Sequence, residues 1–379
     1  MSIIYMDYAA TSPVRSEVLE AMLPYLKRQF GNPSAVYQLG QDAKGAIETA
    51  RERVAAVLSC TSREVFFTSG GTESVNWAIS GAARARKDTG RHIITSRIEH
   101  HCVLHTCQSL EKEGFEVTYL PVDRYGIIDI KELEGAIRDD TTLVSVMLAN
   151  NEVGVVQPLA DIARLTSSRG ILLHTDAVQA FGHIHINVHE LGADMLSVSG
   201  HKLGAPKGVG GLYIRSGIKL DNLLFGGGQE RGRRAGTENV AGIVAMGVAS
   251  ALATEDMEAE AKRITDLREI LASLILPRLE SASRNGSPDK TLPGILNLSF
   301  KGIEGESLLL LLSQQGICAS AGSACASGSL EASHVLASMG VPKELAQASL
   351  RLSLGRETTP AEVSTTADAV TASVRHLLG

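Results

Sequence analysis

Short β-branched or apolar runs alternate with helix-periodic segments from residue 16 to about residue 255. Among the latter, Ile47, Ala50, Val54, Val57 and Leu58 recur at the spacing of one helix face. This alternation is typical of a mostly parallel sheet flanked by helices. We therefore expect an α/β fold with seven strands, near residues 64–68, 91–95, 115–120, 143–148, 171–175, 194–199 and 211–215.

A change of pattern near residue 255 predicts a second, smaller α+β domain. A charged helical segment is followed by a turn-rich stretch at 281–294, because Gly, Pro, Asn, Asp and Ser gather there. Thr359 and Pro360 mark the start of a final helix as N-cap and first helical residue. The other elements expected here are strands at 294–300 and 350–354 and a helix at 306–315. We place the large domain at 16–258 and the small domain at 1–15 plus 259–379, although the first dozen residues could pack against either.

Composition excludes several classes of protein. With 379 residues, 44% of them hydrophobic, the chain can bury two cores, and its formal net charge of −6 gives no electrostatic reason to bind nucleic acid or an anionic membrane. Apolar runs are shorter than the ~18 residues of a membrane span, and no signal peptide is expected. Five cysteines without a CxxC pair indicate reduced thiols and a cytoplasmic protein.

Polar residues gather at the carboxyl ends of three predicted strands, where open α/β sheets bind ligands. The first group, 69–72 (SGGT), could hold a phosphate at a helix N-terminus, or be a turn with Thr72 as N-cap. The second contains His174, Asp176 and Gln179. Asp176 could hold a ring nitrogen or a metal, or only cap a helix, but a zinc site lacks a third ligand at the usual spacing.

The third group centres on Lys202, in a loop of small residues between His201 and Leu203. Such a lysine suits Schiff-base chemistry, and the alternative is an exposed loop lysine, which we expect for Lys207. A phosphate cradle, an acid for a pyridinium nitrogen and a Schiff-base lysine are together the parts that pyridoxal phosphate needs.

The chain resembles the NifS/IscS-type cysteine desulfurases over essentially its whole length. These are class V members of the fold type I pyridoxal-phosphate enzymes. The motifs that carry the resemblance are YMDYAATSP (5–13), GNPSA (31–35), FTSGGTESVN (67–76), EHHCVL (99–104), ANNEVGVVQP (149–158), HTDAVQ (174–179), SGHKLGAPKGVG (199–210), GGGQERGRRAGTEN (226–239) and SAGSACASGS (320–329).

The resemblance implies roles around the cofactor ring. Lys202 matches the lysine that forms the Schiff base, and Asp176 the partner of the pyridine nitrogen. Gln179 and Asn151 match residues near the phenolic oxygen, with Asn151 also near the substrate, and His100 matches the imidazole that stacks on the ring.

The resemblance also implies the remaining contacts. Thr237 matches a phosphate ligand contributed by the other subunit of a homodimer. Arg351 matches the arginine that holds the substrate carboxylate, and Cys325 the nucleophile. The phosphate ligands expected within one subunit are Gly71, Thr72, Ser199 and His201.

For some of these roles the sequence offers a second candidate residue. His101 stands beside His100 and Asn150 beside Asn151, so either neighbour could take the role. Arg356 is a second candidate for the carboxylate, unless it only pairs with an acidic neighbour. The basic run RGRR (231–234) is too short for a nucleic-acid site, and anion handling at a subunit interface is the better interpretation.

Residues 319–329 consist only of Ala, Ser, Gly and Cys325. Because such a segment has almost no apolar side chain to bury, we expect it to move and to carry a travelling nucleophile. Cys60, Cys102, Cys107 and Cys318 are interpreted as packing residues, with Cys318 behind Ile317 a good example.

The expected activity converts L-cysteine to L-alanine and leaves the sulfur as a persulfide on Cys325, with His100 as acid or base. A NifU/IscU-like scaffold would receive the sulfur for iron–sulfur cluster assembly, and Cys325 is a candidate transient ligand of iron. The segment QERGRRAGTEN and the short C-terminus favour the NifS branch, which serves nitrogenase. The alternatives are a selenocysteine lyase, a class V aminotransferase, or a non-catalytic protein that binds a sulfur carrier.

Overall fold

The central sheet of the computed structural model confirms the expected α/β class. Residues 3–321 and 332–379 are described, and within them a seven-stranded sheet has the order β2-β8-β7-β6-β5-β3-β4. Strand β8 runs antiparallel to both of its neighbours, and the other pairings are parallel. The strands are β2 (Val65–Thr68), β3 (His92–Ser96), β4 (Glu116–Leu120), β5 (Thr141–Ser145), β6 (Leu172–Asp176), β7 (Met195–Ser199) and β8 (Gly210–Ile214).

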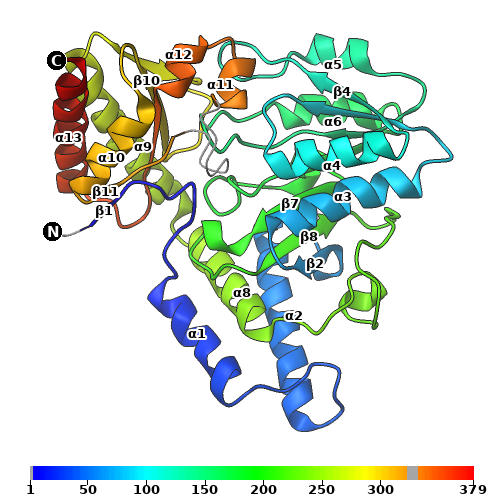
Figure 1. Cartoon of the computed structure of the whole chain (residues 1–379). Coiled ribbons are helices and arrows are strands. Elements are labelled where there is room, and N and C mark those ends of the chain that lie inside the picture. Colours follow the sequence, from blue (N-terminus) through cyan, green and yellow to red (C-terminus); the bar gives the residue numbers. More distant parts are fainter. Residues whose placement is uncertain (1–2, 322–331) are drawn as a thin grey trace.

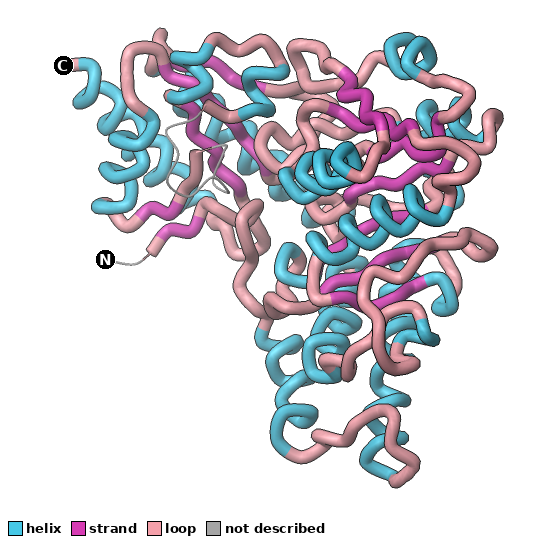
Figure 2. The backbone as a smooth tube through the Cα atoms, turned by 45° about the vertical axis from the view of Figure 1, so that its right-hand side comes forward, coloured by secondary structure: helices cyan, strands magenta, loops and turns pink. Residues whose placement is uncertain are grey.

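Helices cover both faces of this sheet (Figures 1 and 2). Successive strand residues point to opposite faces, so Phe66 and Leu172 pack in one core and Phe67 and Leu173 in another. The first core is closed by α3 (Gly71–Ala85) and α4 (His101–Lys112). The second is closed by α1 (Ser16–Lys27), α2 (Gln38–Leu58), α5 (Ile130–Ala136), α6 (Leu159–Ser167), α7 (Val188–Leu191) and α8 (Val240–Thr254).

A three-stranded antiparallel sheet with the order β12-β10-β9 organises the C-terminal part. Its strands are β9 (Ala282–Asn285), β10 (Ile295–Phe300) and β12 (Ser349–Ser353). It shares a separate core with α9 (Met257–Ile275), α10 (Gly305–Gln314) and α13 (Pro360–Leu378). The smaller elements are α11 (His334–Ser338), α12 (Lys343–Gln347) and the short helices Ser62–Glu64, Gly200–Lys202, Glu230–Gly232 and Leu276–Arg278.

The N-terminal segment contacts both parts of the molecule. Strand β1 (Ile4–Tyr5) pairs with β11 (Ile317–Cys318), and Asp7 bridges to Ser353 of β12. Five residues later, Ser12 Oγ donates to the carbonyl of His201. Residues 5–12 therefore run from the small sheet to the large one, and the division near residue 258 stays a proposal.

The cysteine prediction is wrong for one residue. Cys107 is buried and Cys60 and Cys102 are partly buried, but Cys318 is exposed. Because side chains alternate along a strand, burial of Ile317 in β11 turns Cys318 outward.

No single helix in residues 3–321 and 332–379 has the length and apolar character needed to cross a membrane; α8 and α9 meet that test only as a pair bent by 76°.

Candidate active site

A cavity of about 290 Å³ lies at the carboxyl ends of β6 and β7. Ten of the residues singled out from the sequence line it: Gly71, Thr72, His100, Asn151, Asp176, Gln179, Ser199, His201, Lys202 and Arg351. Thr237 is exposed and does not line it. Cys325 and most of the 319–329 segment lie outside the described residues.

The junction between β2 and α3 forms an anion cradle. Helix α3 starts at Gly71, and its N-cap Gly70 offers no side chain to the first N–H groups, which remain available to an anion. A Cβ on Gly71 would lie 2.6 Å from Val178 Cγ2, so the packing requires glycine. Thr72 is the second residue of the helix, which rules out the alternative role of Thr72 as N-cap.

An acidic side chain beside this cradle, Glu73, is paired with an arginine. The Glu73 carboxylate lies 2.7 Å from Arg234 Nε and accepts the Ser69 N–H at 2.9 Å. Burial alone would raise the pKa of Glu73, but these hydrogen bonds outweigh burial and lower it. The Glu73–Arg234 pair therefore leaves the cradle without an uncompensated negative charge.

Asp176 ends β6 and is 7% exposed. Its Oδ1 accepts the Val178 N–H at 2.9 Å in a local turn, so it does not cap a helix. Burial raises the pKa of Asp176 to about 6, against the opposing effects of that hydrogen bond and of Lys202. A cationic ring nitrogen placed against this carboxyl group would favour its ionised form.

His174 has a structural role. Its ring nitrogens lie 2.8 Å from Ser145 Oγ and 2.9 Å from Ser197 Oγ, and burial lowers its pKa to about 3. Within the described ranges, no group of three or more His, Cys, Asp or Glu side chains is arranged to hold a metal ion.

His100 is the N-cap of α4 and receives the Cys102 N–H on Nδ1 at 3.1 Å. Burial, followed by the charge of Lys202 and the neighbouring histidines, lowers the pKa of His100 to about 4. A neutral ring that accepts on Nδ1 carries its proton on Nε2. His101 also lines the cavity, so the structure brings both histidines of the pair to it.

The two neighbouring asparagines have different surroundings. Asn150 is fully buried and holds the loop together, since its Oδ1 accepts the Glu152 and Val153 N–H groups and its Nδ2 donates to the Ile98 carbonyl. Asn151 lines the cavity.

Lys202 is not an exposed loop lysine. Its Nζ donates to the carbonyl oxygens of Ala9 and Ala10 at 2.6 and 2.8 Å, and Gln179 Nε2 donates to Ala9 at 2.8 Å. Lys207 is exposed, as expected. The N-terminal segment thus forms one wall of the site.

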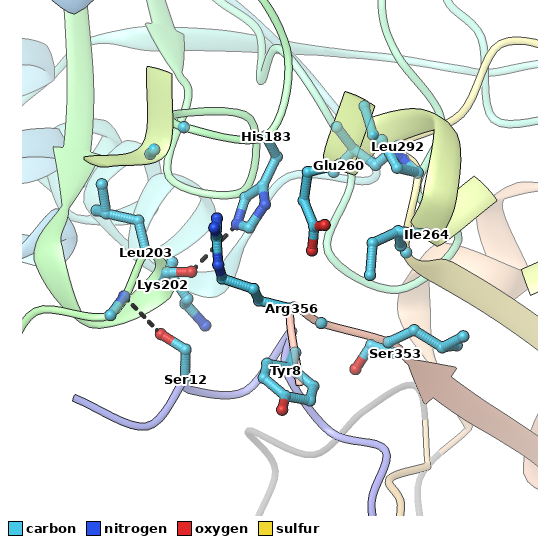
Figure 3. Close-up of a pocket in the computed structure, with 18 of the residues that line it drawn as sticks. Tyr8, Ser12, His183, Lys202, Leu203, Glu260, Ile264, Leu292, Ser353 and Arg356 are labelled. Atoms are coloured by element: carbon cyan, nitrogen blue, oxygen red, sulfur yellow. Dashed lines mark hydrogen bonds between the residues drawn. The ribbon is translucent and has the colours of Figure 1, made fainter. Parts of the chain in front are cut away.

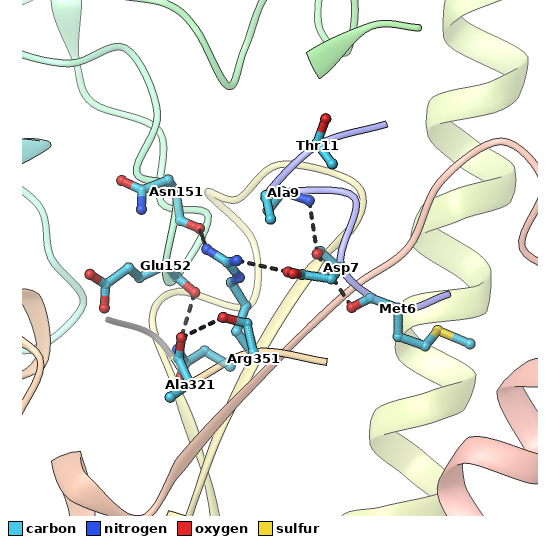
Figure 4. A network of polar contacts seen from close by, with 12 residues as sticks. Met6, Asp7, Ala9, Thr11, Asn151, Glu152, Ala321 and Arg351 are labelled. Carbon is cyan, nitrogen blue, oxygen red and sulfur yellow. Dashed lines mark hydrogen bonds and ion pairs between the residues drawn. The ribbon is translucent and has the colours of Figure 1, made fainter. Parts of the chain in front are cut away.

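Arg351 of β12 brings a buried cation to the cavity, with its side chain 3% exposed. Its Nη2 lies 2.8 Å from Asp7 Oδ1 and its Nη1 donates to the Asn151 carbonyl at 2.9 Å (Figure 4). Its Nε has no hydrogen-bond partner among the described residues. An N–H group of this kind is suited to a carboxylate ligand.

Known proteins are similar to the chain over nearly its whole length. Residues 4–365 match the model of the aminotransferase class-V family. The chain belongs to the aminotransferase class-V family. It is 54% identical to a cysteine desulfurase IscS of Methanosarcina thermophila, covering 99% of this chain and 92% of the relative. The human cysteine desulfurase is 48% identical, covering 99% and 82%. A solved structure of a NifS-like protein matches with a TM-score of 0.94 and 40% identity, covering 99% of this chain and 100% of the other.

The remaining arginine candidates of this class-V chain have internal partners. Arg356 pairs with Asp256 at 2.7 Å beside a second cavity of about 150 Å³, which shares Ala9, Gln179 and Lys202 with the first (Figure 3). Arg231 donates to backbone carbonyls, and Arg234 pairs with Glu73. The guanidinium groups of Arg231 and Arg234 therefore stabilise the fold around the cradle.

Sequence reasoning missed four polar groups of the site, two in side chains and two in the backbone. They are the Asp7 carboxylate, the Ala9 and Ala10 carbonyl oxygens, and Glu152, which lines the cavity and accepts Ser333 Oγ at 2.5 Å. The motif YMDYAATSP stood out in the sequence, but no local pattern showed what its residues contact.

Proposed function

We propose that this chain is a pyridoxal-phosphate-dependent cysteine desulfurase that converts L-cysteine to L-alanine and leaves the sulfur on Cys325. The observation that carries the proposal is the convergence of Lys202, Asp176 and Arg351 on one cavity. Membership of the aminotransferase class-V family and relatives named cysteine desulfurase at 48–54% identity support it.

The residues of the cavity fit the cofactor. The uncapped start of α3, with Thr72, Ser199 and His201, offers donors to a phosphate, and the buried Asp176 carboxyl offers an acceptor to a protonated ring nitrogen. Gln179 and Asn151 would lie at the phenolic oxygen, His100 would lie on the ring face, and Lys202 would hold the aldehyde carbon. Bound there, pyridoxal phosphate supplies an electron sink for the charge that develops at the substrate Cα.

Arg351 orients the substrate. Its guanidinium is buried and already fixed by Asp7 and the Asn151 carbonyl, so little side-chain freedom is lost when a carboxylate binds to its unpartnered Nε–H. This contact fixes the amino acid with its Cα near Lys202, whose amine takes the Cα proton.

His100 acts as a proton donor. Because its Nδ1 accepts the Cys102 N–H, the proton that the neutral ring carries is on Nε2. We propose that this N–H donates a hydrogen bond to the departing substrate sulfur, or donates the proton in the step that follows. In this proposal the ring starts neutral, not as an imidazolium.

The transfer step balances without an added oxidant. The Cys325 thiolate attacks the substrate sulfur, an S–S bond forms as the C–S bond breaks, and the carbon takes a proton to give L-alanine. The enzyme keeps the persulfide Cys325–S–SH. Since Cys325 lies outside the described residues, its role rests on the SAGSACASGS motif and on the relatives.

A homodimer belongs to this proposal. Thr237 is exposed and does not line its own chain's cavity, as we expect of a ligand for the partner's phosphate. Large apolar side chains are also exposed on α1, in the loop that follows it and near residue 225. A contiguous exposed apolar patch is typical of a subunit interface, and we propose that these residues form one.

The sulfur acceptor is proposed to be an iron–sulfur scaffold protein in the cytoplasm. The QERGRRAGTEN segment favours a NifU-like scaffold and nitrogenase maturation over an IscU-like one. In this role Cys325 would be a transient iron ligand. Transfer of labelled sulfur from the persulfide to each purified scaffold distinguishes the two partners.

Two variants test the activity. Lys202→Ala should lose the visible absorbance of covalently bound cofactor, because no other described lysine lines the cavity. Cys325→Ala should keep that absorbance and lose sulfide release from L-cysteine. Cys318→Ala is the matched control, since Cys318 is exposed and outside the cavity, and it should keep both. Sulfide release by Cys325→Ala at the wild-type rate would refute the nucleophile assignment. Equal rates with L-selenocysteine and L-cysteine would favour a lyase with broader specificity.

A further inference from the structure

The Asp7–Arg351 pair joins residues 344 positions apart in the sequence, and Arg351 lines the cavity. Asp7 Oδ1 lies 2.8 Å from Arg351 Nη2, and the Arg351 side chain is 3% exposed while that of Asp7 is 19% exposed. The cation of the cavity is therefore paired with an anion of the same chain before any ligand arrives.

The backbone fixes Asp7 firmly in this place. Strand β1 pairs with β11 immediately before it, and Asp7 itself bridges to Ser353. Just after it, the Tyr8 N–H donates to the Ser353 carbonyl and the Ala9 N–H to Ser353 Oγ. Ser353 lies two residues after Arg351 in β12, so the two ends of the ion pair are carried by adjoining extended segments (Figure 4).

Only part of the Arg351 guanidinium is occupied. Nη2 meets Asp7, Nη1 meets the Asn151 carbonyl, and Nε has no partner among residues 3–321 and 332–379. A carboxylate that binds at the Nε edge comes within a few ångströms of the Asp7 carboxylate. Like charges at that distance repel, and in a partly buried site water screens the repulsion incompletely.

We propose that Asp7 sets the affinity of this site for amino-acid carboxylates: it holds the Arg351 guanidinium in place and offsets its charge, so that L-alanine leaves readily and L-cysteine can replace it. This inference rests on the proposed function, because it takes the substrate and product to be amino acids whose carboxylates bind Arg351.

Asp7→Asn distinguishes the hydrogen bond that holds the Arg351 guanidinium from the negative charge of Asp7. The amide oxygen of asparagine can still accept the Arg351 Nη2–H, but the negative charge is gone. We expect the dissociation constant of L-alanine for the holoenzyme, measured by calorimetry, to fall on the order of tenfold. Asp7→Glu keeps the charge and should stay close to the wild type.

Two controls isolate the carboxylate. Cysteamine is L-cysteine without its carboxylate, so its binding should be the same in the wild type and in Asp7→Asn. Asp368→Asn removes an equivalent charge from the exposed Arg278–Asp368 pair and should leave the affinity for L-alanine unchanged.

The outcomes discriminate between the two proposals. Failure of the wild type to form alanine from L-cysteine refutes the proposed function, whatever the variants do. An active wild type whose Asp7→Asn variant binds L-alanine no more tightly, or binds cysteamine more tightly by the same factor, overturns the role of Asp7. Retained cofactor absorbance in Asp7→Asn shows that the site itself is intact.

Discussion

Glu99 is a fully buried carboxyl group next to the N-cap of α4. It accepts Ser96 Oγ at 2.6 Å and the Met147 N–H at 3.0 Å, and its backbone carbonyl accepts His334 Nε2 at 2.9 Å. Burial outweighs these hydrogen bonds and raises the pKa of Glu99 to about 8. The group therefore holds a proton in the folded protein at a pH where the unfolded chain has released it.

This proton predicts how the stability of the cofactor-free protein depends on pH. Between pH 6.5 and 8 the folded state binds more protons at Glu99 than the unfolded state, so the contribution of Glu99 to the free energy of unfolding should fall as pH rises. Histidines whose pKa is lowered in the folded protein, among them His100 and His174 with pKa values of about 4 and 3, act in the opposite direction. Their effect fades above pH 6.5 and is common to the wild type and a Glu99 variant, so the difference between the two reports Glu99.

Glu99→Gln should remove this contribution. The slope of its unfolding free energy against pH should then differ from that of the wild type by at most ~1.4 kcal/mol for each pH unit. Glu152, whose pKa burial raises to about 7, would supply a remaining slope. Urea unfolding at several pH values measures the change, and Glu258→Gln, at an exposed position, is the control. A slope identical to that of the wild type would show that Glu99 is ionised when folded.

At this scale, the sequence allowed prediction of residues whose chemistry is unusual for their surroundings. Lys202 in a glycine-rich loop and Asp176 at a strand end both line the cavity, and their roles stay predictions. Asp7 and Glu99 could not be found in the same way, because their significance depends on burial and on partners distant in the chain. Cys325 stays a prediction.

The ends of the elements follow local signals. Helix α13 starts at Pro360 after the N-cap Thr359, as its sequence predicts, and Thr359 and Glu362 form a reciprocal capping box. The two-residue strands β1 and β11 and the strand β9 in a turn-rich stretch were not predicted, because they depend on tertiary pairing and not on their own pattern.

Thr359→Ala should lower the free energy of unfolding by about 1 kcal/mol, because the Glu362 N–H in the first turn of α13 loses its acceptor, Thr359 Oγ1, and the Glu362 carboxylate loses the Thr359 hydroxyl as a donor. Thr365→Ala is the matched control in the same helix. Thr365 is exposed and bonds only the Ala361 carbonyl, so the change should be neutral or slightly stabilising. Equal losses in the two variants would argue against the cap.

The whole molecule is proposed to act as a dimer. Leu26, Phe30, Val36, Tyr37 and Phe225 are 59–92% exposed. In Figure 1, α1 and the adjoining end of α2 extend away from the two sheets, which leaves them free to meet a second copy. Pairing there would also let Thr237 reach the partner's cradle.

Phe225→Asp should shift the protein towards a monomer in sedimentation measurements and weaken retention of the cofactor, because a charge would then have to be buried at the interface. Leu310→Asp changes an equally apolar residue that is 59% exposed on α10 and should keep the dimer. Dissociation by Leu310→Asp but not by Phe225→Asp would place the interface elsewhere.

The central claim is that sulfur leaves L-cysteine through a covalent stage on Cys325. Incubating the holoenzyme with L-cysteine, alkylating it and measuring the masses of its peptides tests this most directly. We predict one added sulfur atom on the peptide that contains Cys325, none on those with Cys60, Cys102, Cys107 or Cys318, and an equivalent amount of alanine. Alanine formed with no sulfur on Cys325, or sulfur found on another cysteine, would contradict the account.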